Sequence, residues 1–321
     1  MTSTELAGGA PNALTARLES ADAEVRRIAV MELPYSDIDD IVPSLLHALG
    51  DEDARVRADA AKAAEGFEEP AVIAALLPLL RDAHEETRRA AADSLAELKD
   101  AGNASALLAL TGDADAFVVA AVFRALRALR APGGLAPALA ALEHPASIVR
   151  REATGVLGYL KAPAALPALT RIAMNDPDAD VRRIAIGALG FAADGAVLPA
   201  LVKGLRDASW QVREEAAGTL GKLMLGTATA QLIDAMADEY WQVRVRAARS
   251  LGRLKARSAV ETLSAALAHE ISNLRKEAAI ALGEIGDPRA IPALEHALDD
   301  PDPDVRKLTQ LALRQIQGGA L

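Results

Sequence analysis

The sequence predicts an all-α fold: a right-handed α-solenoid of about ten stacked two-helix repeats. Three observations lead to this prediction: a motif recurring at a fixed spacing, apolar positions at helical spacing within each copy, and abundant helix-favouring alanine and leucine. The clearest copies are SWQVREEAAGTLGKL (Ser209 to Leu223) and YWQVRVRAARSLGRL (Tyr240 to Leu254), which start 31 residues apart. Because a pair of short helices cannot bury its apolar face alone, we expect neighbouring copies to stack.

Each copy contains an anchor, usually the valine of a Val-Arg pair, from which the other columns are counted. The anchors are spaced by 31 residues, except for one step of 32, and arginine follows the anchor in nine copies. Alanine stands four residues past the anchor in eight copies, and leucine stands eight residues past it in nine. This spacing predicts an amphipathic helix, which we call helix B. The anchors are Val25, Val56, Thr87, Val118, Val149, Val181, Val212, Val243, Leu274 and Val305.

A second helix, helix A, is expected before each helix B, as in AVLPALVKGL (Ala196 to Leu205). Proline recurs near its start, where a missing N–H costs little, at Pro43, Pro167, Pro199 and Pro292. In seven copies the turn between the helices carries aspartate five residues before the anchor: Asp51, Asp82, Asp113, Asp176, Asp207, Asp238 and Asp300. We interpret the aspartate and arginine columns as a ladder that caps helix B and ties neighbouring turns, rather than as a binding strip.

These columns favour one elongated array over residues 1–321. Its expected parts are an N-terminal capping repeat at 1–35, central repeats at 36–289 and a C-terminal capping repeat at 290–321.

The pattern D-x-x-x-x-V-R-x-x-A-A-x-x-L-G-x-L, as in DASWQVREEAAGTLGKL (Asp207 to Leu223), resembles the HEAT-repeat superfamily. The resemblance is to its 31-residue branch, named after the phycobilisome lyase subunits, and it covers nearly the whole chain. It implies that helix B lines a concave, ligand-facing surface and helix A a convex one. It narrows the function little, because the superfamily includes scaffolds, assembly factors, lyases and DNA-binding modules.

Composition argues against several classes of function. The absence of cysteine excludes disulfides, thiolate metal sites and cysteine nucleophiles. A formal charge of −10 disfavours sequence-independent nucleic-acid binding, which depends on Lys and Arg. The N-terminal residues lack a signal-peptide pattern, and no apolar run approaches the roughly 18 residues of a membrane span. We therefore expect a cytoplasmic protein with neither a nucleic-acid nor a membrane partner.

No constellation of catalytic or metal-binding residues stands out in the sequence. His47 and His296 share one repeat position, and His144 and His269 share another, so members of each pair are too far apart to hold one metal. The pairs His84-Glu85 and His269-Glu270 fall in turns, unlike the His-Glu pairs on facing helices of the HEAT-like iron hydroxylases. The aspartate-rich turn at 299–304 lacks the glycine and glutamate of a calcium loop. We therefore expect no catalytic residue, no cofactor and no metal.

Candidate partner-binding residues come from positions that packing does not dictate, in repeats five to eight. We expect the aromatic candidates to lie on one edge of the helix-B layer, where Trp and Tyr serve well as binding anchors. The candidates are Tyr159 and Phe191, ten residues past their anchors; Trp210 and Trp241, two before theirs; Tyr240; and Arg246 and Arg249.

Glycine in a helix costs up to about 1 kcal/mol relative to alanine, so three glycines in register six residues past their anchors need a reason. Two reasons remain open: close approach of a partner, or tight packing between neighbouring helices B. The three are Gly155, Gly187 and Gly218.

Repeat four is irregular. Val119 replaces the ladder arginine, Phe123 occupies a position that is usually small, and Arg124, Arg127 and Arg130 form a basic stripe. The stripe is compatible with a hinge, with an interaction point for an acidic helix, or with a repacked, degenerate repeat.

The function that these features favour is a non-enzymatic scaffold or adaptor that binds another protein on its helix-B surface in repeats five to eight. The alternative is an assembly or bilin-lyase-like factor acting on a cofactor-bearing protein, which only the family resemblance implies. A DNA-binding module would need a basic concave face, whereas the helix-B positions mix arginine with glutamate, as at Arg151-Glu152.

Overall fold

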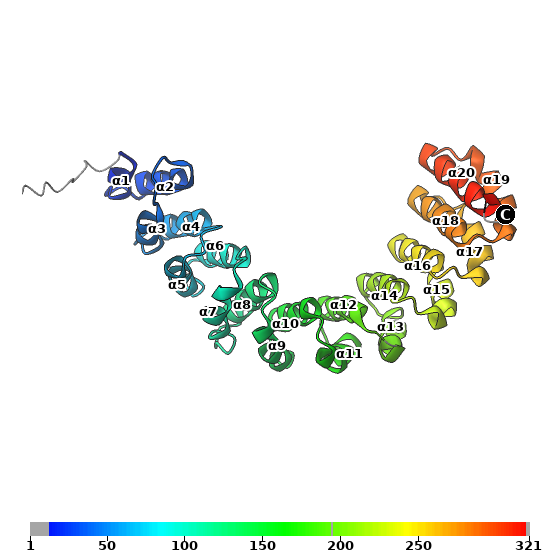
Figure 1. The fold of residues 1–321 in the computed structure, drawn as a ribbon, viewed down its shortest axis with the longest axis horizontal. Coiled ribbons are helices and arrows are strands. Elements are labelled where there is room, and N and C mark those ends of the chain that lie inside the picture. Colours follow the sequence, from blue (N-terminus) through cyan, green and yellow to red (C-terminus); the bar gives the residue numbers. More distant parts are fainter. Residues whose placement is uncertain (1–12, 194, 319–321) are drawn as a thin grey trace, which may run out of the picture. The chain divides into compact units, whose positions relative to one another are not determined.

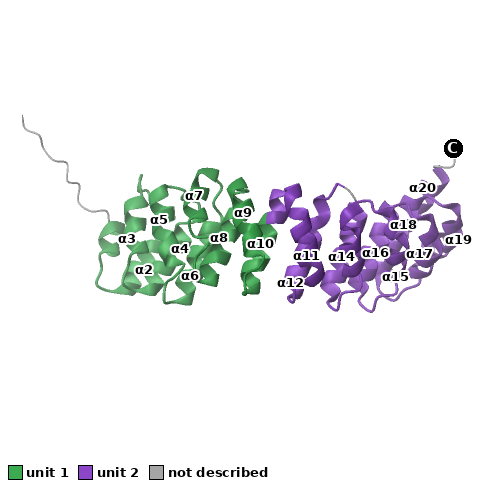
Figure 2. Cartoon of the chain, turned by 90° about the horizontal axis from the view of Figure 1, so that it is seen from below, with its two compact units in different colours: residues 1–156 green, residues 157–321 purple. Residues whose placement is uncertain are grey.

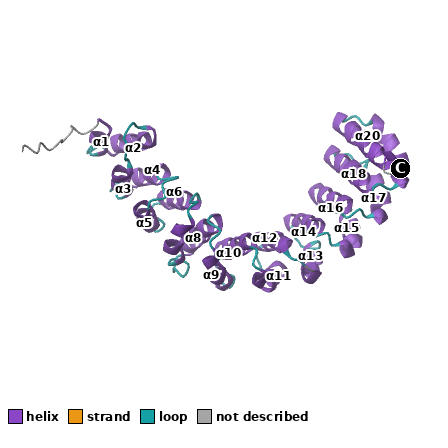
Figure 3. Ribbon diagram, viewed as in Figure 1, coloured by secondary structure: helices purple, strands orange, loops and turns teal. Residues whose placement is uncertain are grey.

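The computed structural model describes residues 13–193 and 195–318. This part of the chain consists of helices joined by short turns and 3₁₀ segments and contains no strand (Figure 1, Figure 3). The chain divides into two compact units, residues 1–156 and 157–321, with the boundary inside one helix (Figure 2). The structure confirms the predicted all-α solenoid of two-helix repeats.

In unit 1 the odd-numbered helices correspond to helix A and the even-numbered ones to helix B. Each even-numbered helix from α2 to α6 contacts the next one of its layer, and α1 and α3 likewise contact the next odd-numbered helix. The helices are α1 (Ala13–Leu18), α2 (Ala23–Glu32), α3 (Val42–Leu49), α4 (Ala54–Ala63), α5 (Pro70–Leu79), α6 (Glu85–Ala96), α7 (Ala104–Leu108), α8 (Ala116–Ala128), α9 (Leu135–Ala141) and α10 (Ser147–Leu160), which runs into unit 2.

Unit 2 repeats the arrangement. Taken by itself, it carries its even-numbered helices on the inner side of the curve that its repeats describe (Figure 1). Its helices are α11 (Leu166–Asn175), α12 (Ala179–Ala188), α13 (Leu198–Gly204), α14 (Trp210–Lys222), α15 (Thr229–Ala235), α16 (Trp241–Arg253), α17 (Val260–Ala266), α18 (Ser272–Ile285), α19 (Ile291–His296) and α20 (Pro303–Gly318).

The repeat columns form the core. In α14 the anchor Val212, Ala216 and Leu220 are all fully buried, and the equivalent residues of the other central repeats are buried in the same way. Val25, in the first repeat, is only half-buried. The recurring prolines open α3, α11, α13 and α19 as expected. Residues 1–12 and 319–321 of the expected capping repeats lie outside the described residues.

The Asp–Arg ladder is confirmed in five turns, whereas Asp113 pairs with Arg81 instead of the ladder arginine Arg88. Arg275 donates from Nε and Nη2 to both carboxylate oxygens of Asp300 in the next turn, at 2.7 and 2.9 Å. Its Nη1 donates to the carbonyl oxygens of His269 and Glu270 in its own turn, at 2.8 and 3.0 Å. Asp300 in turn accepts the N–H of Asp302, at 2.8 Å. The same paired geometry joins Arg26 to Asp51, Arg57 to Asp82, Arg182 to Asp207 and Arg213 to Asp238, always 25 residues along the chain.

The irregular fourth repeat is repacked. Phe123 is fully buried in α8, and two arginines of the basic stripe form ion pairs with neighbouring helices. Arg124 lies 2.7 Å from Asp93, and Arg127 lies 3.1 Å from Glu152. These contacts favour the repacked-repeat interpretation over an interaction point.

Several helices B end in a left-handed residue twelve positions past the anchor. In repeat nine that residue is Gly286, with φ at 71°. Elsewhere it is a residue with a side chain, as at Lys255, with φ at 50°, where the left-handed conformation costs roughly 1–2 kcal/mol.

Replacing Lys255 by glycine should therefore stabilise the protein. Removing the backbone strain at position 255 is partly offset by the greater conformational entropy of glycine in the unfolded chain. We therefore expect a gain of about 0.5–1 kcal/mol in the free energy of unfolding. Urea unfolding followed by circular dichroism measures it. Gly286→Ala is the matched control and should lose about 1 kcal/mol; equal stability of both variants would contradict this explanation of the helix ends.

Removing a ladder arginine should destabilise the stack. Arg275→Ala deletes the hydrogen bonds of Arg275 and leaves the buried Asp300 carboxylate without its main partner, so the free energy of unfolding should fall by about 2–4 kcal/mol. Arg314→Ala, at an exposed site on α20, should change it by less than about 0.5 kcal/mol. Similar losses in both variants, measured by thermal and urea unfolding, would contradict the structural role of the ladder.

Stability should also depend on the charge of the ladder aspartates. The hydrogen bonds from Arg275 lower the pKa of Asp300 against the opposing effect of burial. At Asp238, burial raises the pKa, but the hydrogen bonds from Arg213 and from the Tyr240 N–H outweigh it and the pKa is lowered. Asp302, which is not a ladder residue but lies in the same turn as Asp300, also has a lowered pKa: a hydrogen bond from Lys276 lowers it to about 2.

A carboxyl group whose pKa is lower in the folded state contributes stability above its unfolded pKa, which is about 3.9. That contribution is lost as the pH falls through the folded value. The urea midpoint should therefore fall between about pH 4 and pH 2. Arg275→Ala, in which Asp300 has lost its arginine, should show a smaller fall; an identical pH profile would exclude the ladder as its source.

Candidate partner-binding surface

The structure places the candidate aromatic residues on unit 2 and leaves them accessible to different extents. Tyr159, near the end of α10, is 49% exposed, and Tyr240, at the start of α16, is 39% exposed. Phe191, Trp210 and Trp241 are half-buried.

The expectation that these aromatic side chains share one edge is wrong. Trp210 and Trp241 are the first residues of α14 and α16, whereas Tyr159 and Phe191 lie at the ends of α10 and of the 3₁₀ segment that follows α12. The two sets of positions lie twelve residues apart in the repeat, or about 18 Å along a helix at 1.5 Å per residue. The helices α12, α14 and α16 pack side by side in one layer, so the two sets face its opposite edges.

One set forms a compact cluster, which we call the aromatic edge: Trp210, Tyr240 and Trp241. The rings of Trp210 and Tyr240 stack with centroids 5.4 Å apart and an angle of 14° between their planes. The guanidinium carbon of Arg213 lies 5.6 Å from the centroid of the Tyr240 ring. Asp238 accepts the Tyr240 N–H at 2.9 Å and also pairs with Arg213, so the ladder itself positions the stacked rings.

The helix starts beside the aromatic edge lack the aspartate caps of α2, α4, α8 and α12, as does the start of α6. Asp178 caps α12 by accepting two N–H groups, whereas Ser209, Tyr240 and Ile271 hold the same position before α14, α16 and α18 without a side-chain cap. Three successive helix starts therefore leave N–H groups to water or to an acceptor from elsewhere. The sequence analysis did not predict this feature. The signal is nevertheless present in the sequence, because these three repeats have no aspartate three residues before the anchor.

The candidate arginines belong to a second feature on α16, which we call the basic ridge: Arg246, Arg249 and Arg253. Their spacing of three and four residues places them on one face of the helix. Arg246 pairs with Glu214 of α14 at 2.9 Å, and Arg249 pairs with Glu277 of α18 at 2.6 Å. Arg253 was not among the predicted residues.

A cavity of about 180 Å³ adjoins the basic ridge. We call it the basic pocket. It is lined by Gly187, Glu215, Gly218, Thr219, Lys222, Arg246, Arg249, Ser250 and Arg253.

The glycines six residues past the anchor are explained by packing. A Cβ on Gly187 would lie 2.7 Å from a carboxylate oxygen of Glu215, and one on Gly218 would lie 3.0 Å from Cδ of Arg246. Gly187 and Gly218 thus each lie under a charged side chain from the next helix B, whereas Gly155 lies against Arg127 of the preceding one, whose Nη1 would be 3.0 Å from a Cβ. This favours the packing explanation over direct contact between these glycines and a partner.

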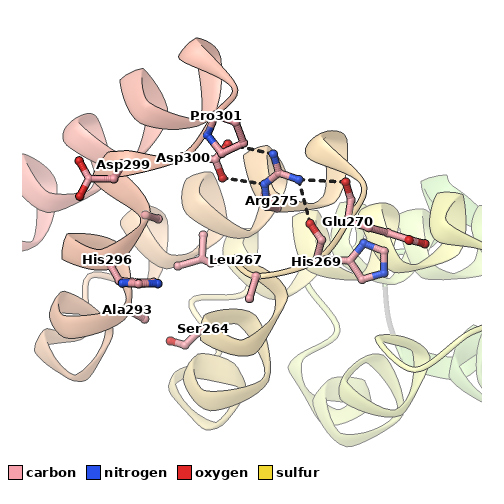
Figure 4. Close-up of a pocket in the computed structure, with 12 residues that line it drawn as sticks. Ser264, Leu267, His269, Glu270, Arg275, Ala293, His296, Asp299, Asp300 and Pro301 are labelled. Carbon is pink, nitrogen blue, oxygen red and sulfur yellow. Dashed lines mark hydrogen bonds and ion pairs between the residues drawn. The ribbon is translucent and has the colours of Figure 1, made fainter.

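A larger cavity, about 530 Å³, lies between α17 and α19 beside the last ladder pair (Figure 4). His269 and His296 border it, but His269 already serves the fold, because its Nδ1 accepts the Ile271 N–H at 3.0 Å. Within the described residues, no group of three or more His, Asp or Glu side chains is arranged to hold a metal ion. No helix of that part of the chain combines the length and apolarity that crossing a membrane requires.

Solved structures share this architecture. An engineered protein superposes with a TM-score of 0.55 at 23% identity, covering 95% of this chain and 98% of its own. Escherichia coli YibA does so with a TM-score of 0.55 at 18% identity, covering 93% and 98%. Kap95p, a protein that binds RanGDP, gives a TM-score of 0.66 at 12% identity, and the match covers 94% of this chain and 51% of that one. At these identities the likeness concerns the fold alone.

No curated protein matches the sequence. The sequence does match the family model for HEAT repeats, in overlapping segments that together cover most of the chain: residues 11–96, 73–158, 103–189, 135–221, 166–239 and 229–314. The matched segments and the stacked two-helix architecture agree, and the chain belongs to the HEAT repeat family.

Proposed function

We propose that this protein is a non-enzymatic scaffold or adaptor that binds a partner protein on the helix-B surface of repeats five to eight. HEAT repeat solenoids commonly serve as protein-interaction scaffolds, and Kap95p, which shares the fold, binds a protein partner. The matches give no support to the bilin-lyase alternative.

The observation that carries the proposal is the aromatic edge. Trp and Tyr supply much of the binding energy at protein interfaces, where a few anchors dominate. Here Tyr240 is 39% exposed, yet it is stacked on Trp210 and fixed through the ladder by Arg213 and Asp238. Because the rings are held in place before binding, these side chains would lose little conformational entropy when a partner docks on them.

The surroundings also suit a protein better than a nucleic acid. The uncapped starts of α14, α16 and α18 offer N–H donors next to the rings. The basic ridge is flanked by Glu214 and Glu277, which would repel a continuous phosphate backbone.

The test compares variants at the two edges of the helix-B layer. In the edge variant, Trp210, Tyr240 and Trp241 are each replaced by alanine; in a second variant, Tyr159 and Phe191 are replaced. The control is Tyr35→Ala, at an aromatic residue that is 87% exposed in unit 1. Affinity capture with mass spectrometry identifies the partner, and titration with the purified partner gives the dissociation constants.

The edge variant should bind at least about 30-fold more weakly, as expected for the loss of one anchor worth about 2 kcal/mol, while its helical circular dichroism is retained. Tyr35→Ala should bind normally. The second variant shows whether the surface extends to the other edge. The proposal fails if a folded edge variant binds the partner as tightly as the unaltered protein.

A further inference from the structure

We propose that the basic pocket binds an acidic side chain of the partner protein, so that the partner's segment presents a carboxylate or a phosphorylated residue to unit 2. This inference rests on the proposed function, and it names the chemistry that the partner must carry.

The lining of the pocket is strongly unbalanced in charge. Four cationic side chains border it: Lys222 of α14 and Arg246, Arg249 and Arg253 of α16. Glu215 is the one carboxylate among the lining residues. The acidic partners of Arg246 and Arg249, which are Glu214 and Glu277, do not line the pocket.

Two of the four cations have no ionic partner within the described part of the chain. Lys222 and Arg253 are both exposed, and neither forms an ion pair or side-chain hydrogen bond to another described residue. Lys222 reaches over the end of the neighbouring repeat, where a Cβ on Gly190 would lie 2.8 Å from its Nζ. These two side chains are therefore available to an anion without breaking an internal pair.

The floor of the pocket is already satisfied internally. Ser250 is 1% exposed and donates its hydroxyl hydrogen to the carbonyl oxygen of Ala217 at 2.7 Å. Gly187 and Gly218 have no side chain to fill the hollow, so it stays open between the charged side chains above them. The arrangement fits a small oxyanion, which arginine recognises through paired N–H donors.

Position in the fold favours a peptide as the source of that anion. The basic ridge lies on α16, the helix that begins with Trp241 of the aromatic edge. Trp241 and Arg253 are twelve residues apart, or about 18 Å along the helix. An extended segment of about six residues spans that distance, so one partner segment can place an apolar residue on the edge and an acidic one at the pocket.

The experiment uses the full chain and three fluorescent probes: a hexaglutamate peptide, a glycine-rich peptide with two phosphoserines, and a short DNA duplex. Fluorescence anisotropy at about 50 and about 300 mM NaCl gives the affinities. The pocket variant is Lys222→Gln with Arg253→Gln. The matched control removes one lysine and one arginine from α13 and the turn after it, with Lys203→Gln and Arg206→Gln. Circular dichroism confirms that each variant is folded.

We expect at least one of the two peptides to bind, with affinity that falls at the higher salt concentration. The pocket variant should bind it about ten-fold more weakly or worse, because two charge-assisted contacts are lost, whereas the control should bind it normally. Glu215→Gln removes the opposing charge without changing the shape, so it should bind the peptide several-fold more tightly. If Lys222 and Arg253 only stabilised the fold, Glu215→Gln would not bind the peptide more tightly.

The comparison of the two peptides identifies the source of the anion, since binding of the phosphoserine peptide alone assigns a phosphorylated partner. The proposal is overturned if neither peptide binds, if the pocket and control variants bind equally, or if the duplex binds and depends on Lys222 and Arg253. Failure of peptide binding together with loss of partner capture in the aromatic-edge variant would reject this inference and leave the proposed function intact.

Discussion

In unit 2 the architecture depends on how closely neighbouring helices B can approach one another. A Cβ on Gly252 would lie 2.7 Å from Cα of Ala281, and one on Gly283 would lie 3.0 Å from Cα of Ala312. These glycines, nine residues past their anchors, face the backbone of the next helix, so any side chain there would force the helices apart. Close approach has a second effect on the surface. The charged side chains of one helix lie over the small residues of the previous one, which organises the ion pairs of α14, α16 and α18.

The ladder then fixes the turns in the same register. In the five paired turns the arginine holds the carbonyl groups of its own turn and the carboxylate of the next, so two successive turns share one side chain. In repeats seven and eight the ladder also holds the aromatic edge. Asp238 pairs with Arg213 and accepts the backbone N–H of Tyr240. The rigidity of the aromatic edge is thus a consequence of the same contacts that stabilise every other repeat.

Much of the fold could be predicted because each column repeats the same physical requirement. Val212, Ala216 and Leu220 meet identical surroundings in every central copy, and one aligned period is enough to assign them to the core. The candidate surface was only partly predictable. Trp210 and Tyr240 belong to different copies, and their stacking depends on the lateral offset between two helices, which no column records.

The prediction of a single edge failed for a related reason. Core packing does not dictate the residue two before the anchor or the residue ten after it. That shared property does not reveal how far apart the two positions lie along the helix axis, and this separation puts them on opposite edges of the layer. The availability of Lys222 and Arg253 was also beyond sequence reasoning, because the ion pairs of Arg246 and Arg249 are decided by which rotamers reach the adjacent helices.

The ladder is interrupted where histidine replaces its aspartate. His144 and His269 cap their turns as the aspartates do, accepting the N–H groups of Ala146 and Ile271 through Nδ1 at 3.1 and 3.0 Å. With Nδ1 occupied in this way, a neutral imidazole offers only an N–H donor at Nε2, so it cannot accept an arginine. The ladder position one repeat before His144 is accordingly a valine, Val119.

Before His269 the arginine is retained as Arg244, and its buried Nε has no hydrogen-bond partner among the residues that the structure describes, an arrangement that costs about 1–3 kcal/mol. This break falls between the turns that lead into α16 and α18, beside Tyr240 and Trp241 and among the uncapped helix starts. The ladder contacts are therefore incomplete beside the aromatic edge, as they also are between Val119 and His144. The histidine thus keeps the cap of its turn but gives up the ladder contact to Arg244.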